Sequence, residues 1–215
     1  MNHMLSYLKN PIYCDNQKPR AFYLLFLVMV YIISIIPVAL IILVICRNFH
    51  IEQDIISYSS FKTVLLGIIL APIIEEIMFR SLLKFTKSNV ILFIIIVSAL
   101  IVYTAIKSET EFLIILSILL ISILFFLLIA SRNKIELFIS SNFKYFLYAS
   151  AITFGLAHAS NFNGNIYAII AFSLILGGPQ IIMGLISGFV RMNYGLIYSI
   201  MFHMMINSIL LLKFI

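Results

Sequence analysis

Two adjacent carboxylates interrupt an apolar stretch of the sequence, in the segment PIIEEIMFR at residues 72–80. Glu76 and Arg80 are spaced i, i+4, so one face of a helix can hold them as an ion pair. Glu75 points roughly 100° away from Glu76 on the same helix and is not engaged by that pair. We interpret Glu76 and Arg80 as supporting residues and Glu75 as a carboxylate available for chemistry. The alternative is that the whole segment is structural, with Arg80 reaching toward the membrane surface.

Two histidines and an asparagine stand in other apolar stretches of the chain. His158 ends the segment FGLAH, which begins at Phe154, and His203 begins the segment HMMIN, which ends at Asn207 one helical turn later. The other two histidines lie in polar segments. A single histidine in an apolar helix is more often a packing residue, and that interpretation applies to each of these taken alone. Polar groups in membrane helices usually face the protein interior, where they are paired or functional.

Together these side chains suit the hydrolysis of an amide bond. A carboxylate and an imidazole, here Glu75 and His158, can activate a water molecule as a nucleophile. A second imidazole and an amide, here His203 and Asn207, can donate to the oxyanion that develops. Glu75, His158 and His203 also supply the three protein ligands of a catalytic zinc site. Because the i, i+4 histidine pair of HExxH is absent, no metal is demanded, and the cofactor stays open between none and Zn²⁺.

The composition indicates that these residues belong to an integral membrane protein. The chain has 215 residues, of which 63% are hydrophobic and 10% charged, and its mean hydropathy is +1.16. A soluble domain is typically about half apolar and a quarter charged. The net charge of +6 is explained by basic residues at the ends of membrane spans, and no motif points to a nucleic-acid partner. We therefore expect contact with membrane lipid and none with nucleic acid.

Charge-free stretches predict an all-α fold, a polytopic bundle of seven transmembrane helices. An eighth follows if LGGPQ, at residues 176–180, splits the sixth. The predicted spans cover residues 21–46, 63–83, 88–106 and 112–131, two helices within 145–190 on either side of the turn HASNFNGN, and 192–212. The first is too long for a signal peptide and lacks a cleavage site, so we expect a retained anchor.

The predicted organisation is a polar cytoplasmic N-terminus at residues 1–20, an anchor span with its loop at 21–60, and a membrane domain at 61–212. The positive-inside rule places the N-terminus in the cytoplasm. The predicted cytoplasmic ends carry Lys9, Lys18, Arg20, Lys84, Lys87, Arg132, Lys134, Lys144 and Arg191, and the opposite ends only Arg47, Lys62, Lys107 and Lys213. A composition rich in Ile, Lys and Asn favours the cell (inner) membrane of a bacterium.

The segments EEIMFR, FGLAH and HMMIN resemble the EExxxR, FxxxH and HxxxN motifs of the CPBP intramembrane proteases. That family includes the type II CAAX prenyl endopeptidases and the bacteriocin-processing and self-immunity proteins formerly called the Abi group. Each motif is unspecific alone, but all three in this order, each on a predicted span, are specific together. The resemblance covers about Phe61 to Leu212.

The resemblance implies an intramembrane endopeptidase, described in part of the family as a metalloprotease, that cuts a membrane-associated peptide or protein. It implies Glu75 and His158 as the water-activating pair, His203 and Asn207 as the oxyanion site, and Glu76, Arg80 and Phe154 as supporting residues. If a metal is bound, Glu75, His158 and His203 are its expected ligands. Whether the substrate is prenylated, and whether the role is peptide maturation, immunity or signalling, does not follow from these motifs.

Two other classes of function are compatible with the same residues. The first is a non-catalytic membrane protein, such as an immunity protein, that binds a peptide or bacteriocin through the same cavity. The second is a small transporter whose glutamate and histidines carry protons. The transporter is disfavoured because the sequence shows no inverted repeat.

Overall fold

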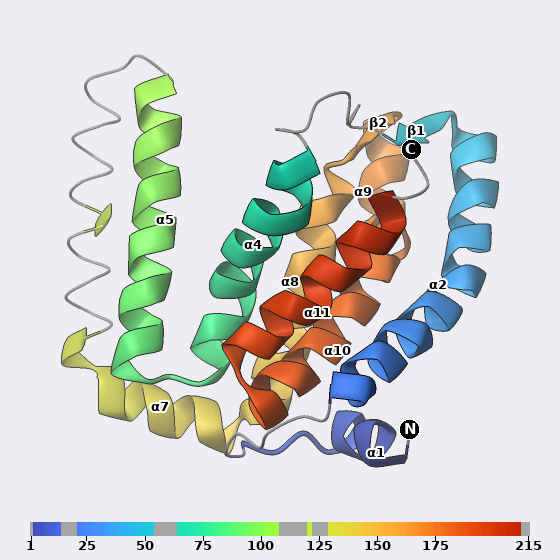
Figure 1. The fold of residues 1–215 in the computed structure, drawn as a ribbon. Coiled ribbons are helices and arrows are strands. Elements are labelled where there is room, and N and C mark those ends of the chain that lie inside the picture. The colour runs from blue at the N-terminus through green and yellow to red at the C-terminus, as the bar shows by residue number, and fades with distance from the viewer. Residues whose placement is uncertain (1, 14–20, 54–63, 108–119, 122–128, 212–215) are drawn as a thin grey trace.

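Helices account for most of the described chain, as the all-α prediction requires. The computed structural model describes residues 2–13, 21–53, 64–107, 120–121 and 129–211. In chain order the elements are α1 (Asn2–Lys9), α2 (Ala21–Phe49), β1 (Ile51–Gln53), the π-helical turn η1 (Leu66–Leu70), α4 (Ala71–Arg80), the 3₁₀ turn η2 (Ser81–Leu83), α5 (Lys87–Lys107), α7 (Arg132–Ser141), α8 (Phe143–Ala159), β2 (Phe162–Gly164), α9 (Ile166–Leu176), α10 (Gly178–Tyr194) and α11 (Leu196–Leu211) (Figure 1).

Three helical runs within the described residues are long and apolar enough to cross a membrane. They are Phe22–Phe49, Lys87–Thr104 and Ile166–Tyr194, and Leu196–Leu210 is a shorter apolar helix. Large apolar side chains cover the outward surface of α2, and Phe22, for example, is 82% exposed. Such a surface is stable where lipid is the solvent. The predicted fourth span, at 112–131, lies largely outside the described residues.

The segment LGGPQ interrupts the helix without reversing the chain. The Gly177 N–H donates to the Ser173 carbonyl at 2.8 Å, and the Ile181 N–H donates to the Gly177 carbonyl at 2.9 Å. Main-chain bonding therefore continues from α9 into α10. Pro179, which has no N–H to donate, accounts for the break between them. The two helices together form the single apolar run Ile166–Tyr194.

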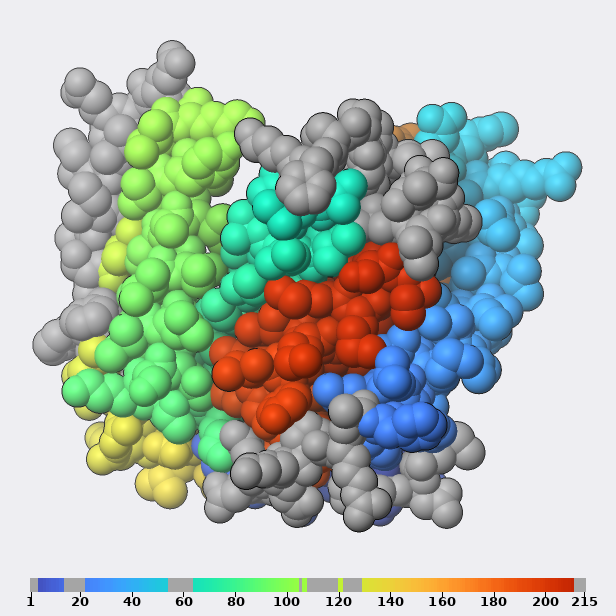
Figure 2. Space-filling model, viewed as in Figure 1, coloured from blue at the N-terminus to red at the C-terminus, as the bar shows by residue number. Residues whose placement is uncertain are grey.

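The core of the molecule surrounds α10, which packs against α8, α11 and α2. Small residues allow α8 and α10 to approach closely, as expected for helices in membranes. A Cβ atom added to Gly184 would lie 2.9 Å from the Cα of Ala151, and one added to Gly188 would collide with the Leu147 side chain. Figure 2 shows α11 on one face of the molecule, between α4 and α2.

Two segments outside the predicted spans, one in the polar N-terminus and one in a loop, are helical. Helix α1, within the predicted polar N-terminus, buries Met4 and Tyr7 in the core that α2, α8 and α10 share. The Tyr148 hydroxyl of α8 donates to the carbonyl of Leu8. Helix α7 runs across the same end of the bundle (Figure 1). The anchor helix and the N-terminus are therefore packed into the same core as the helices that carry the motifs.

A two-stranded antiparallel sheet lies at the opposite end of the bundle (Figure 1). Strands β1 and β2 pair Ile51 with Gly164 and Gln53 with Phe162. Gly164 has φ +126°, and a Cβ at this position would collide with the carbonyl of His50. The predicted turn HASNFNGN thus contains a short strand, and it ends at Asn165, whose side chain caps α9 by accepting from the N–H of Tyr167.

Candidate active site

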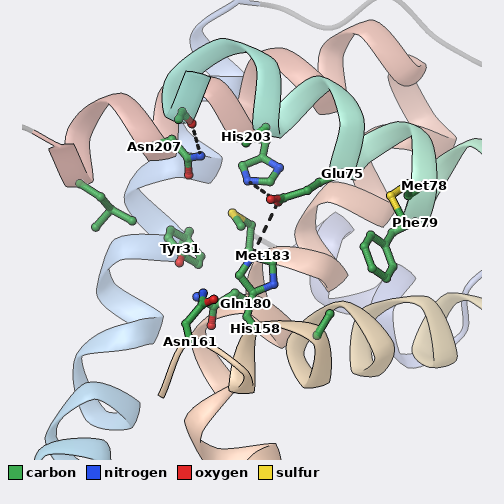
Figure 3. A pocket seen from close by; sticks show the side chains of 14 residues that line it. Tyr31, Glu75, Met78, Phe79, His158, Asn161, Gln180, Met183, His203 and Asn207 are labelled. Carbon is green, nitrogen blue, oxygen red and sulfur yellow. Dashed lines mark hydrogen bonds and ion pairs between the residues drawn. The ribbon is translucent and has the colours of Figure 1, made fainter. Parts of the chain in front are cut away.

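The four predicted catalytic side chains line one pocket of about 530 Å³. They come from three helices, with Glu75 on α4, His158 near the end of α8, and His203 and Asn207 on α11. Figure 3 shows these side chains directed into the pocket. The lining residues are Tyr31, Gly67, Ala71, Glu75, Met78, Phe79, Ala157, His158, Asn161, Gln180, Met183, His203, Asn207 and Leu210.

The Glu75 carboxylate lies between the two imidazoles. Its Oε2 atom is 3.7 Å from Nε2 of His158 and 3.6 Å from Nε2 of His203. The side chains of Glu75 and His158 are 26% and 21% exposed, whereas that of His203 is almost fully buried. Of the three ionisable side chains, the Glu75 carboxylate and the His158 ring therefore face the pocket more openly than His203.

Glu76 is turned into the core, where its carboxylate contacts both His203 and Arg80. Its Oε1 atom is 3.1 Å from Nδ1 of His203, and its Oε2 atom accepts from the Ser199 hydroxyl. Arg80 Nε lies 3.7 Å from Oε2 of Glu76, so the predicted i, i+4 ion pair is present. The same carboxylate also orients the His203 ring, a contact that the sequence did not predict. Ser199 was not predicted, because a lone serine in an apolar helix carries no pattern.

The hydrogen bonds of the two imidazoles fix which nitrogen of each ring faces the pocket. His158 Nδ1 lies 2.9 Å from the Phe154 carbonyl oxygen, which can only accept. His203 Nδ1 faces the carboxylate of Glu76, which also accepts. Each Nδ1 therefore carries a proton, and each Nε2 points toward Glu75. In a neutral ring, that Nε2 has a free lone pair.

Phe154 supports both the histidines and the buried arginine. Its ring centroid is 4.6 Å from that of His158 and 5.8 Å from that of His203. The Arg80 guanidinium carbon lies 4.1 Å from the same centroid, a cation–π contact. Among the described residues no hydrogen bond reaches the Arg80 guanidinium. Gly184 leaves room for it, since a Cβ there would be 3.1 Å from Nη2.

Asn207 makes a contact that its expected role does not require. Its Nδ2 atom donates to the carbonyl oxygen of Gly67, in the π turn η1, at 3.0 Å. One amide hydrogen of Asn207 is therefore engaged within the protein, and the second is not used by this bond. The oxyanion role for Asn207 stays a prediction.

Three polar residues of the pocket were missed by the sequence prediction. Tyr31 comes from α2, Asn161 follows α8, and Gln180 comes from the first turn of α10. The Gln180 Oε1 atom is buried and has no hydrogen-bond partner within the described part of the chain. Tyr31 lies in a helix that is apolar on every side, so no periodic pattern marks it as a pocket residue.

The three expected zinc ligands, Glu75, His158 and His203, come together as described. Nevertheless, no group of three or more His, Cys, Asp or Glu side chains among the described residues has an arrangement that could hold a metal ion.

Comparisons of the chain give no independent family assignment. No protein-family model, curated protein or solved structure matches it. A resemblance to the CPBP family therefore rests on the three motifs alone.

Proposed function

We propose that the chain is an intramembrane endopeptidase that hydrolyses a peptide bond of a membrane-associated peptide or protein. One observation carries the proposal: Glu75, His158 and His203, from three different helices, meet in one pocket inside an apolar bundle. Ionisable groups at such a position are costly and are a functional-site hypothesis by default. The resemblance of the three motifs to those of CPBP proteases supports the same reaction.

In this proposal Glu75 and His158 activate the hydrolytic water. Their facing atoms are 3.7 Å apart, so one water molecule can lie at about 2.8 Å from both. As the water oxygen attacks the scissile carbonyl carbon, a proton passes to this pair and the carbonyl electrons move onto oxygen. When the tetrahedral intermediate collapses, the C–N bond breaks and the proton passes to the leaving nitrogen. The products are a carboxylic acid and an amine, which ionise to a carboxylate and an ammonium group in water.

His203 is the proposed donor to the oxyanion. A ring protonated on both nitrogens donates Nδ1–H to Glu76 and presents Nε2–H toward the pocket. Because the ring is buried and fixed by Glu76, it needs little reorganisation during the reaction. The motif resemblance implies Asn207 as a second donor, but we assign the oxyanion to His203, because the Asn207 amide donates to the Gly67 carbonyl. Glu76, Arg80 and Phe154 support this arrangement from the core.

We further propose that the bundle lies in a bacterial inner membrane with seven spans and its N-terminus in the cytoplasm. The spans would be α2, η1 with α4, α5, a helix within residues 112–131, α8, α9 with α10, and α11. The continuous bonding through Gly177 supports counting α9 and α10 as one span. Lipid and the peptide substrate are the expected partners.

Substitution of Glu75 by glutamine tests the reaction. Purified protein in liposomes is incubated with a library of apolar peptides, and new termini are identified by mass spectrometry. The Glu75→Gln variant should accumulate like the parent but lose roughly 10²–10⁴-fold in rate, because it lacks the base. Glu52→Gln is the matched control, since Glu52 is an exposed residue of β1. Equal cleavage by Glu75→Gln and the parent would end the assignment.

The same experiment separates an enzyme from a non-catalytic binding protein. A peptide that binds the parent and the Glu75→Gln variant, and that neither protein cuts, would favour the immunity-type alternative. Cleavage by the parent alone would favour the endopeptidase.

A further inference from the structure

We propose that Asn207 is a positioning residue: its amide holds the turn that precedes α4, and thereby fixes where Glu75 stands in the pocket. The inference rests on the proposed role of Glu75 as the catalytic base, and it deepens that role. It gives Asn207 a partner inside the protein, the carbonyl of Gly67, where the motif resemblance implies a contact with the oxyanion.

The Gly67 carbonyl lacks a main-chain donor because of how the helix passes Pro72. In an α-helix this carbonyl would accept from the N–H of Ala71, and in a π turn it would accept from residue 72. The Ala71 N–H donates instead to the carbonyl of Leu66. Residue 72 is a proline and has no N–H. Asn207 Nδ2, at 3.0 Å from the Gly67 oxygen, supplies the missing donor.

Helix α11 therefore forms hydrogen bonds to the segment η1–α4 at two points, one on each side of Glu75 along the chain. Before Glu75 along the chain, Asn207 donates to Gly67. After it, His203 Nδ1 and the Ser199 hydroxyl bond the Glu76 carboxylate.

The position of Glu75 depends on these two attachments, because among the described residues its own carboxylate contacts only the two imidazoles, at distances longer than a hydrogen bond. Among the described residues this carboxylate makes no hydrogen bond, and its nearest partners are the imidazoles at 3.6 and 3.7 Å. The helix backbone thus decides where the base lies. Because a π turn contains an extra residue, its loss rotates one side of the helix relative to the other. A misplacement of about 1 Å can cost roughly 10²-fold in rate.

The experiment uses Pro72→Ala to remove the need for Asn207. An alanine at position 72 restores an N–H, so the Gly67 carbonyl can be satisfied by the main chain in either helical pattern. Asn207→Ala alone should lower the melting temperature in detergent by roughly 5 °C, because it leaves an acceptor without its donor. It should also lower kcat about 10²-fold with KM unchanged. The double variant Pro72→Ala/Asn207→Ala should recover most of both losses.

A labelling measurement reports the position of residue 75 without any need for activity. Glu75→Cys is introduced into a chain whose Cys14 and Cys46 have been replaced by serine, and its rate of reaction with a methanethiosulfonate reagent is recorded. Asn207→Ala should change this rate severalfold, and adding Pro72→Ala should return it to the starting value. Ser208→Ala is the matched control, because the Ser208 hydroxyl donates only to the Met204 carbonyl of its own helix.

Three results would overturn the proposal. If kcat stays equally low in the double variant, Asn207 acts directly on the reaction. If the melting temperature falls while the labelling rate and kcat stay unchanged, Asn207 is structural and does not position Glu75. If Asn207→Ala fails to accumulate, recovery of the double variant supports the proposal and failure of both variants refutes it. A parent protein that cleaves no peptide refutes the proposed function alone, because the labelling comparison still tests the positioning.

Discussion

Replacing Glu76 by glutamine is expected to destabilise the protein more than replacing Arg80 by methionine, although both changes break one ion pair. Both side chains are fully buried, with Arg80 Nε at 3.7 Å from Oε2 of Glu76. Removing one partner of such a pair leaves an uncompensated charge and typically costs about 3–5 kcal/mol. Where each variant falls within this range depends on the contacts that the stranded partner keeps.

The charged residue that remains in each variant, Glu76 or Arg80, has very different surroundings. After Arg80→Met, Glu76 retains its hydrogen bonds with His203 and Ser199, so we expect a cost near the lower limit, about 3 kcal/mol. After Glu76→Gln, the Arg80 guanidinium retains the face of the Phe154 ring, and no hydrogen bond from a described residue reaches it. We expect this cost near the upper limit, about 5 kcal/mol.

The assay is the free energy of unfolding, measured by denaturant titration of the purified variants in detergent micelles. The double variant Glu76→Gln/Arg80→Met removes both charges, so its free energy of unfolding should be no lower than that of the less stable single variant. The reasoning is refuted if the double variant loses the sum of the two single costs, or if Arg80→Met is the more damaging change. The parent and Glu52→Gln give the reference values.

Three further predictions follow from the same packing. Phe154→Leu should cost about 2 kcal/mol of unfolding free energy through its cation–π contact with Arg80, and Phe79→Leu should cost less because its ring is 5.7 Å from the guanidinium. Hydrolysis should survive exhaustive chelation, because a carboxylate and an imidazole can activate water without a metal; recovery of an inactive chelated enzyme by stoichiometric zinc would contradict this. Lys134→Cys should react with an impermeant thiol reagent only after cells are opened, whereas Arg47→Cys should react in intact cells. The reverse pattern would overturn the predicted orientation.

Helix periodicity was sufficient to predict that the two adjacent glutamates have different surroundings. A rotation of roughly 100° per residue means that neighbours cannot share one environment. In the structure Glu76 is fully buried beside Arg80, whereas Glu75 reaches the pocket. The helices themselves follow from long charge-free runs, as the match between predicted span 88–106 and α5 illustrates. Both features are local, and for that reason one sequence reveals them.

Contacts between helices could not be predicted in the same way. The bond from His203 to Glu76 depends on how α11 is rotated about its axis where it crosses α4, and helices that are apolar on all sides give no indication of that rotation. Tyr31 was missed for the same reason. The strands β1 and β2 contain three residues each, too few for an alternating pattern to be recognised.

The spacing in HMMIN acquires a structural reason from the two attachments of α11. Residues at i and i+4 lie one above the other on a helix, so His203 and Asn207 face the same neighbour at two heights. Their partners, Glu76 and Gly67, lie on either side of Glu75 along η1–α4. A spacing that suits two donors to one oxyanion is therefore also the spacing needed to hold the base at two points. Because Pro72 creates the need for the second attachment, substitution at position 72 can distinguish these two explanations of the motif.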